Sequence, residues 1–198
     1  MTPGYKYVDP DYIYSDRNGV LFNLLGITEP ELLSVTEALL TSKRLEELSL
    51  RPIPIKSAYS LLDIHRYIFQ DIYKWAGETR KVDITKQGKQ FITATSFNQA
   101  FFFIDGLISK FRGSAGGIKE ASEYLAKILD AINFMHPFRE GNGRAQREFI
   151  RLLALEKGYI LQLNPPDNPE VYREYMRCSV EEDVAGLTAL IKSSIVPY

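Results

Sequence analysis

Residues 136–147 read HPFREGNGRAQR and combine side chains that could move a proton with side chains that could hold an anion. His136 is the only side chain in the stretch whose ordinary pKa, about 6.5, lets it accept a proton near neutrality. Arg144 and Arg147 are three residues apart in a predicted helix, so they share a face, and a guanidinium can contact phosphate oxygens in pairs. The carboxylate of Glu140 would suit a divalent cation that bridges it to phosphate. The stretch indicates chemistry on a phosphorylated ligand.

The segments on either side place this stretch between two helices. An amphipathic segment at about 118–133 precedes it, and Pro137 disfavours helical backbone at His136. The Gly-Asn-Gly sequence at 141–143 favours a tight turn, and a second helix of about 143–157 follows. The first N–H groups of that helix and its dipole would point to the same place as the turn. We therefore expect a preformed phosphate site.

The rest of the chain predicts an all-α domain with about six to eight helices and one small β-hairpin, spanning 1–198 as a single unit. Residues 1–27 indicate an irregular arm. Capping boxes are expected at Thr28–Glu31 and Ser96–Gln99. The hairpin is expected at 81–95, where residues that favour extended backbone flank a polar segment with a glycine. The helices are expected at about 28–50, 57–75, 96–111, 118–133, 143–157 and from 169 onward.

Composition and charge are those of an ordinary globular domain. With 24 basic and 25 acidic side chains the net charge is −1, so no basic field favours nucleic acid. A single cysteine excludes an intrachain disulfide, and no apolar run approaches the ~20 residues of a spanning helix. The N-terminus also lacks the pattern of a signal peptide. We expect a cytoplasmic protein without a nucleic-acid or membrane partner, unless a secretion machine reads a signal elsewhere.

Each feature of the stretch also has a purely structural explanation. A lone Gly-Asn-Gly is usually a turn, two arginines on a helix are usually a solvated face, and a histidine before proline is usually structural. Their combination within twelve residues favours function, while Phe138 is expected to anchor the loop in the core. A metallohydrolase site built from His136, Glu140 and His65 is the weakest alternative, because His65 lies on a helix that is expected to pack.

The stretch is similar to the signature of the Fic family, H-x-F-x-[D/E]-G-N-G-R-x-x-R. The residues that match its specified positions are His136, Phe138, Glu140, Gly141, Asn142, Gly143, Arg144 and Arg147. Upstream, IHRYIFQDIYKWAGETRKVDI at 64–84 resembles the helix, the turn and the first flap strand of that family. The resemblance covers the chain from about residue 10 to residue 195.

The resemblance implies a protein adenylyltransferase, which moves AMP from ATP onto a Tyr, Thr or Ser hydroxyl of a target protein and releases pyrophosphate. It implies that His136 is the general base and that Glu140 binds Mg²⁺ against the α- and β-phosphates. The nucleotide-binding residues that it implies are Gly141, Asn142 (near the α-phosphate), Gly143, Arg144 (β-phosphate) and Arg147 (γ-phosphate).

The hairpin at 81–95 acquires a role from the same resemblance. In Fic proteins it is a flap over the active site, and a segment of the target pairs with its exposed edge. Such strand addition fixes the target backbone while reading its sequence loosely. Phe91, Ile92 and Thr93 are the candidate docking residues. The alternative is a small hairpin that only covers the core.

Many Fic proteins carry an inhibitory helix with the motif [S/T]-x-x-x-E-[G/N]. At Ser42 the residue after the glutamate is Glu47, and at Ser179 the glutamate is replaced by Asp183, so neither segment matches. We expect inhibition in trans by a small helical antitoxin whose glutamate pairs with Arg147. The implied targets are the ATPase subunits of type II topoisomerases for a stand-alone toxin, or host proteins for the Fic part of a longer secreted effector.

Two other functions stay open. Some relatives transfer phosphate, phosphocholine or another nucleotide, but the intact Gly-Asn-Gly-Arg sequence favours AMP. The second is a non-catalytic module that only binds a nucleotide or an antitoxin. The presence of His136 and Glu140 argues against it, because binding alone needs no base.

Overall fold

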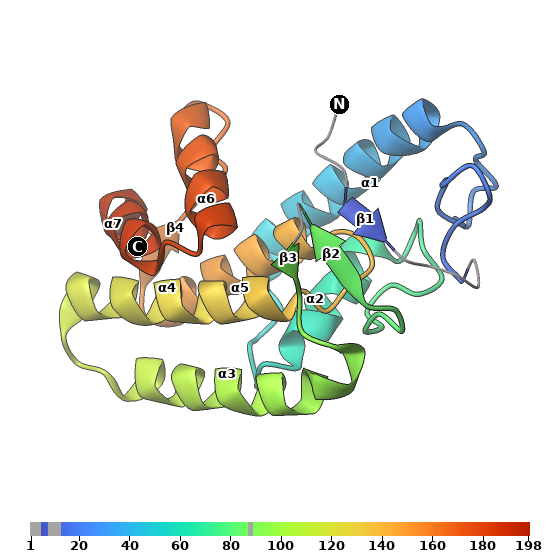
Figure 1. Ribbon diagram of the computed structural model, residues 1–198. Coiled ribbons are helices and arrows are strands. Elements are labelled where there is room, and N and C mark those ends of the chain that lie inside the picture. Colours follow the sequence, from blue (N-terminus) through green and yellow to red (C-terminus); the bar gives the residue numbers. More distant parts are fainter. Residues whose placement is uncertain (1–4, 8–12, 87–88) are drawn as a thin grey trace.

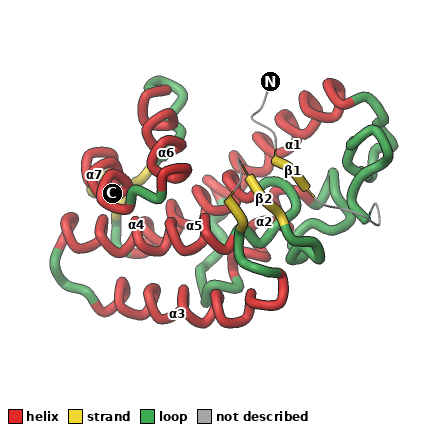
Figure 2. The backbone as a smooth tube through the Cα atoms, viewed as in Figure 1, coloured by secondary structure: helices red, strands yellow, loops and turns green. Residues whose placement is uncertain are grey.

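The computed structural model describes residues 5–7, 13–86 and 89–198. Within these ranges the chain forms seven α-helices and two small antiparallel sheets (Figures 1 and 2). The predicted fold class, mostly helical with a small β flap, is confirmed. The described helices are too short or too polar for any of them to cross a membrane.

The helices and strands follow one another along the chain in a simple order. The helices are α1 (Pro30–Leu50), α2 (Ser60–Phe69), α3 (Phe97–Gly113), α4 (Gly117–Met135), α5 (Asn142–Glu156), α6 (Pro169–Glu181) and α7 (Val184–Ser194), with a 3-10 turn at Ala94–Ser96 before α3. The flap sheet has the order β1-β2-β3, with β1 (Tyr5–Tyr7), β2 (Ile84–Lys86) and β3 (Lys89–Gln90). The second sheet pairs β4 (Tyr159–Leu161) with β5 (Ile195–Pro197).

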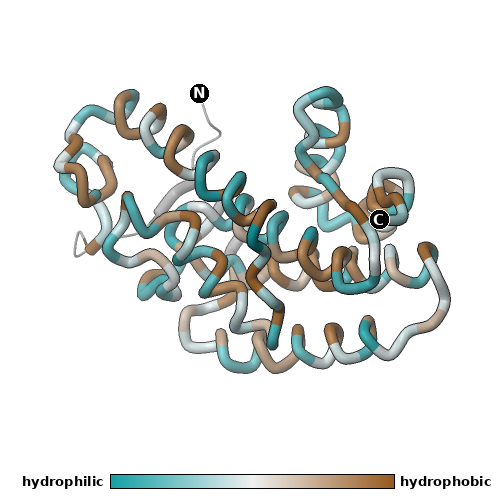
Figure 3. Tube along the Cα trace, turned by 180° about the vertical axis from the view of Figure 1, so that it is seen from behind, coloured by the Kyte–Doolittle hydropathy of each residue, from teal (hydrophilic) through white to brown (hydrophobic). Residues whose placement is uncertain are grey.

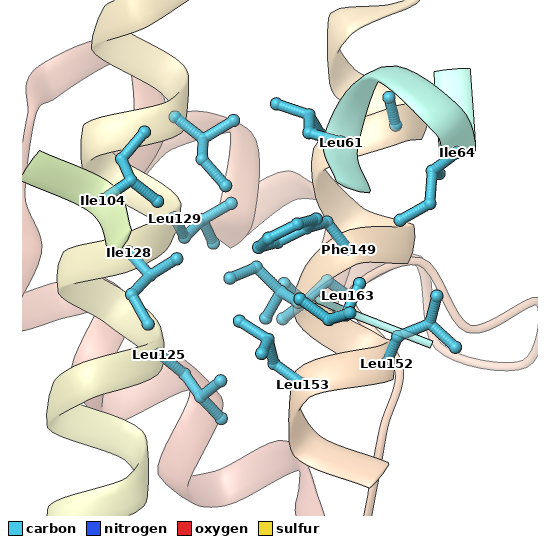
Figure 4. Close-up of a cluster of buried hydrophobic side chains, with 14 of the residues drawn as sticks. Leu61, Ile64, Ile104, Leu125, Ile128, Leu129, Phe149, Leu152, Leu153 and Leu163 are labelled. Carbon is cyan, nitrogen blue, oxygen red and sulfur yellow. The ribbon is translucent and has the colours of Figure 1, made fainter. Parts of the chain in front are cut away.

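The core lies where α5 packs against both α2 and α4. Figure 4 shows side chains from these helices, from α3 and from the loop after β4 pointing toward one another. The labelled members are Leu61, Ile64, Ile104, Leu125, Ile128, Leu129, Phe149, Leu152, Leu153 and Leu163. Burying one such side chain stabilises the fold by about 1.5–3 kcal/mol. The two helices on either side of the loop at 136–141, α4 and α5, are thus anchored in the core.

The first helix is bound less firmly to the core. Leu33 and Leu48 are buried, whereas Leu32, Val35 and Leu39 are exposed, although all five are apolar. Hydrophobic segments are visible along this helix when the molecule is seen from behind (Figure 3). The inner face of α1 contacts α2, which brings the polar residues of α1 toward the N-terminus of α5.

The structure differs from the predicted boundaries at the helix expected over 57–75. That helix ends at Phe69, and the chain turns back so that Gly77, with φ of 80°, lies against it. A Cβ on Gly77 would be 2.7 Å from Cβ of Arg66, which only glycine avoids. The N–H of Gly77 donates to Nδ1 of His65, 2.9 Å away. This N–H thus bonds a side chain of α2 rather than a backbone carbonyl within a helix.

The two predicted capping boxes are absent. The hydroxyl of Thr28 bonds the carboxylate of Glu29, and α1 begins at Pro30 without a side-chain cap. Ser96 belongs to the 3-10 turn and its hydroxyl bonds that of Thr93. Two local partners therefore compete successfully with the helix N–H groups for these hydroxyls.

The sheets are more extensive than the sequence indicates. Part of the arm expected to be irregular, β1, pairs with β2, with Tyr5 opposite Lys86. The pairing of Tyr159 with Pro197 in the second sheet was not predicted at all. Strands of three residues carry too little alternation for a pattern to detect them. The predicted hairpin is present as β2 and β3, and its tip at 87–88 lies outside the described residues.

Candidate active site

Helix α4 ends at Met135, and the candidate stretch at 136–147 begins directly after it with His136. This residue has left-handed backbone, with φ of 44°, and its N–H still donates to the carbonyl of Ile132 at 2.9 Å. Its Nδ1 lies 3.3 Å from the carbonyl oxygen of Asn133. A carbonyl can only accept, so this contact requires the proton on Nδ1, and a neutral ring then carries its lone pair on Nε2. The geometry suits a base that acts through Nε2.

The flap covers the imidazole. The ring of Phe91 stacks on that of His136, with centroids 4.1 Å apart and planes 19° apart, and His136 is only 4% exposed. Phe91 and Ile92 are half-buried and Thr93 is exposed, and all three follow β3 directly. The predicted docking residues thus lie beside the candidate base. Whether a target pairs with them stays a prediction.

A buried histidine of α2 organises the loop after His136. The Nδ1 of His65 accepts the N–H of Gly77, so its Nε2 carries the proton that it donates to the carbonyl of Glu140, 3.0 Å away. The ring also stacks on Phe138, with centroids 3.7 Å apart. Phe138 is fully buried, as predicted for the anchor of the loop.

Burial is the main reason that the pKa of His65 falls to about 3, and the nearby charge of Arg144 lowers it further, against the raising effect of the bond to Glu140. The ring is therefore neutral at physiological pH. Both of its nitrogens bond to the backbone, which argues against the metallohydrolase alternative.

The turn and the start of α5 bring several backbone N–H groups close together in sequence. Gly141 has φ of 80°, and a Cβ there would lie 2.2 Å from Cζ of Phe69, so glycine is required. The carbonyl of Gly141 accepts the N–H groups of Arg144 and Ala145, which are the first hydrogen bonds of the helix. The N–H groups of Asn142 and Gly143 lie before these bonds, so they have no intrahelical acceptor. This is the arrangement expected for phosphate oxygens.

The side chain of Asn142 holds the loop rather than projecting from it. Its Oδ1 accepts the N–H of Phe138 at 2.9 Å, and its Nδ2 donates to the carbonyl of the same residue at 2.7 Å. The residue that the resemblance places near the α-phosphate therefore closes the loop with its side chain, which leaves its backbone N–H as the group available for a ligand.

Arg144, in the first turn of α5, reaches across to α1. Its Nη2 donates to Oε1 of Glu37 at 2.5 Å and its Nη1 donates to the hydroxyl of Thr41 at 3.2 Å. Glu140 lies 3.9 Å from the same guanidinium and accepts the N–H of Gly141. The sequence contains no signal for Glu37, since a lone glutamate on a helix does not reveal a partner 107 residues away.

Burial raises the pKa of Glu140, and the negative charge of Glu37 raises it further, against the lowering effects of the Gly141 N–H and of Arg144. The described residues contain no group of three or more His, Cys, Asp or Glu that could hold a metal ion by themselves. A single carboxylate fits Mg²⁺, which protein sites bind through one or two carboxylates together with phosphate oxygens and water. The donor set is therefore compatible with Mg²⁺ carried by a nucleotide.

Arg147 lies one turn further along α5. Its guanidinium packs over the rings of Tyr172 and Tyr175 of α6, 5.1 and 5.3 Å from their centroids. In the described part of the chain, no carboxylate forms an ion pair with it. A groove of about 390 Å³ between α1 and α5 opens beside both Arg144 and Arg147 and leaves room for an anionic group.

The site thus combines a donor-rich turn at a helix N-terminus, two arginines and an adjacent buried imidazole, which is the arrangement expected of an enzyme that acts on a phosphorylated ligand. Comparison with known proteins gives the family. The Fic/DOC family model matches residues 56–154, and the chain belongs to that family.

Two curated relatives show how far the similarity extends. The chain is 32% identical to Protein adenylyltransferase VbhT of Bartonella schoenbuchensis over 98% of its own length, but spans only 41% of that protein. It is 31% identical to the Probable protein adenylyltransferase Fic of Salmonella typhimurium, covering 94% of this chain and 92% of the relative. These relatives confirm the predicted family and the predicted enzyme class, protein adenylyltransferase.

Solved structures agree on the fold. The N-terminal Fic domain of a VirB-translocated Bep effector from Bartonella quintana superimposes with a TM-score of 0.79 at 22% identity, covering 93% of this chain and 91% of that one. BepC of Bartonella tribocorum with bound AMPPNP gives a TM-score of 0.75 at 21% identity, covering 90% and 93%.

Proposed function

We propose that this chain, as one Fic domain, transfers AMP from ATP to a Tyr, Thr or Ser hydroxyl of a target protein and releases pyrophosphate. The observation that carries the proposal is the position of His136. His136 caps the end of α4, and the loop that begins there leads directly into the glycine turn at the start of α5. A base and a phosphate site would therefore lie on the same short connection between two packed helices. Relatives named as adenylyltransferases and a similar fold with bound AMPPNP support ATP as the donor.

The phosphates would bind at the start of α5. The N–H groups of Asn142 and Gly143 would contact the α- and β-phosphates, Arg144 the β-phosphate and Arg147 the γ-phosphate. Gly141 allows the turn to approach the phosphates closely. Arginine suits this task because its planar fork meets two oxygens at once.

Glu140 would hold Mg²⁺ against the α- and β-phosphates. A bound divalent cation neutralises charge that develops on the leaving pyrophosphate. Its binding would also stabilise the ionised form of Glu140, whose pKa is raised by burial and by Glu37.

The chemical step needs a base, an aligned nucleophile and charge neutralisation. Nε2 of His136 takes the proton of the acceptor hydroxyl as its oxygen attacks the α-phosphorus. The bond from that phosphorus to the bridging oxygen of pyrophosphate breaks, and the electron pair leaves with pyrophosphate. A positioned base contributes roughly 10²–10⁴ in rate, and the arginines stabilise the departing charge.

The flap would hold the target. A segment of the target would pair with the edge of the sheet that continues from β3 through Phe91, Ile92 and Thr93. This edge is favoured because β1 already occupies the other side of β2. Proposed targets are an ATPase subunit of a type II topoisomerase, acting in the cytoplasm, or a host protein after secretion, which the structural similarity to translocated effectors favours.

Restraint by a separate antitoxin is also part of the proposal. Arg147 has aromatic but no acidic partners among the described residues, and a groove lies beside it. The glutamate nearest to the inhibitory pattern, Glu46, is exposed near the C-terminal end of α1, and Asp183 instead pairs with Arg177. An antitoxin glutamate would pair with Arg147. The isolated chain should then modify itself with labelled ATP, and silence despite intact ATP binding would contradict this.

The test of the proposed function is incubation of the chain with ATP, Mg²⁺ and a bacterial or host lysate, followed by mass spectrometry of the modified protein. A mass increase equal to AMP on a hydroxyl side chain is expected. An increase equal to phosphate or phosphocholine would favour the other transfers. No modification, with ATP bound, would favour the non-catalytic alternative.

A further inference from the structure

We infer that Arg80 is a positioning residue that fixes the flap relative to His136. A target segment bound by the flap would then lie in the correct position relative to the imidazole. Arg80 lies between the turn after α2 and the first flap strand, and it is 1% exposed. Its side chain donates hydrogen bonds to backbone carbonyls of the flap and of the loop after α4. The acceptors are the carbonyls of Val82 and Ile92 in the flap and of His136, and none of them belongs to the turn at 141–143.

The guanidinium joins three separate backbone segments. Its Nε donates to the carbonyl of His136 at 2.9 Å, its Nη1 to the carbonyl of Val82 at 2.7 Å, and its Nη2 to the carbonyl of Ile92. The backbone N–H of Arg80 donates to the carbonyl of Pro137 at 2.7 Å. Val82 precedes β2 and Ile92 follows β3, so one side chain ties both ends of the flap to the peptide that follows the base.

The electrostatics of this site favour a geometric role over a simple ion pair. The carboxylate of Asp83 is 3.5 Å away and half-exposed, and it also accepts the N–H of Ala94 in the flap. The ring of Phe97 lies 4.9 Å from the guanidinium carbon. Burying a cation that is satisfied mostly by carbonyls is costly, whereas an apolar side chain could fill the same space. Only a planar, forked donor can reach three carbonyls in fixed directions.

Phe91 connects the hydrogen bonds of Arg80 with the imidazole of His136. The ring of Phe91 stacks on the imidazole of His136, and the next residue, Ile92, is one of the carbonyl acceptors of Arg80. Arg80 therefore holds the neighbour of Phe91 and the backbone of His136 at the same time. Its loss would let the flap shift relative to the imidazole without removing any group from the phosphate site.

The sequence offers an unusually direct test, because His65 and His136 are its only histidines. In a protein with isotope-labelled histidine, the ring current of Phe91 displaces the imidazole proton resonances of His136. Phe91→Leu gives the resonance positions without that ring. His65 stacks on Phe138 instead and serves as an internal reference for the fold. The control is Arg112→Lys, since Arg112 also binds a distant carbonyl, that of Ile55, away from the flap.

In Arg80→Met the His136 resonances should move most of the way to their positions in Phe91→Leu, and in Arg80→Lys part of the way. Those of His65 should stay unchanged in both, and Arg112→Lys should leave both histidines unchanged. Unchanged His136 resonances in a folded Arg80 variant would overturn the inference. If neither Arg80 variant folds, Arg80 is a folding residue and the inference also fails.

The consequence for catalysis rests on the proposed function of His136. Arg80→Lys should lower the turnover of AMP transfer by about tenfold or more, because small misplacements of reacting groups are costly, while the Kd for ATP stays the same. Shifted His136 resonances with undiminished transfer would contradict the positioning role. If the wild-type chain transfers no AMP, the proposed function fails, yet the resonance measurement still decides the geometry.

Discussion

Arg144 of α5 and Glu37 of α1 form an ion pair, with Nη2 and Oε1 2.5 Å apart, at the place where a phosphate group is proposed to bind. The pair orients the guanidinium, but it also places a negative charge beside the phosphates. Tyr73 donates its hydroxyl to the same carboxylate. Glu37 thus sets both the direction of Arg144 and the net charge of the site.

Replacing Glu37 with glutamine should strengthen ATP binding. The amide oxygen can still accept from Arg144, and the amide NH2 can donate to the hydroxyl of Tyr73, while the negative charge is removed. The Kd for ATP with Mg²⁺ should therefore fall about fivefold, or about 1 kcal/mol. Calorimetric titration measures this. Glu47→Gln is the matched control, because Glu47 is on the same helix but pairs with Arg44. Equal or weaker ATP binding in Glu37→Gln would count against a phosphate at Arg144.

The two hydrogen bonds of the His65 ring, one from each nitrogen, can be tested separately by substitution. His65→Gln places a donor near Nε2 and should keep the bond to the Glu140 carbonyl, whereas His65→Asn reaches only toward Gly77. AMP transfer should therefore be reduced much more in His65→Asn than in His65→Gln. The initial rate with labelled ATP measures the difference. Equal rates in the two variants would show that the contact with the loop does not matter.

His65 also predicts a pH dependence of stability. Its pKa is about 3 in the folded chain and about 6.5 when unfolded. The unfolded state therefore binds the extra proton, so this contribution is complete above pH 6.5 and is lost as the pH falls toward 3. Between pH 7.5 and 5.5 the free energy of unfolding should drop by about 1 kcal/mol more in the wild type than in His65→Gln. Urea denaturation at both values tests this, and parallel losses would contradict it.

Gly141→Ala should abolish nucleotide binding and destabilise the fold. Left-handed backbone alone costs an alanine about 1–2 kcal/mol, and the collision of the new Cβ with Phe69 adds about 1–3 kcal/mol. Gly158→Ala is the control, because Gly158 has φ of 75° but nothing within 4 Å of its Cβ position. Thermal unfolding should separate the two variants clearly, and similar losses would show that the contact with Phe69 relaxes.

The parts of the site that could be predicted from the sequence are those whose residues lie close together in the sequence. His136 at a helix end, the glycine turn and the arginines of α5 lie within twelve residues, so their spacing determines how they meet. Phe138 was recognisable as the anchor of the loop for the same reason.

The remaining parts depend on contacts between segments far apart in the chain. Glu37 pairs with Arg144 across 107 residues, and Arg80 binds the His136 carbonyl across 56. The early end of α2 has a similar cause, since Gly77 satisfies its N–H on His65 rather than on a helical carbonyl. Local patterns carry no information on such partners.

The central claim is that His136 removes the proton from the acceptor hydroxyl while ATP lies at the start of α5. The most direct measurement compares His136→Ala with the wild type for both ATP affinity and AMP transfer from labelled ATP in the presence of Mg²⁺. We predict that the Kd for ATP changes little and that transfer falls by about 10²–10⁴. Undiminished transfer in a folded His136→Ala chain would contradict the account.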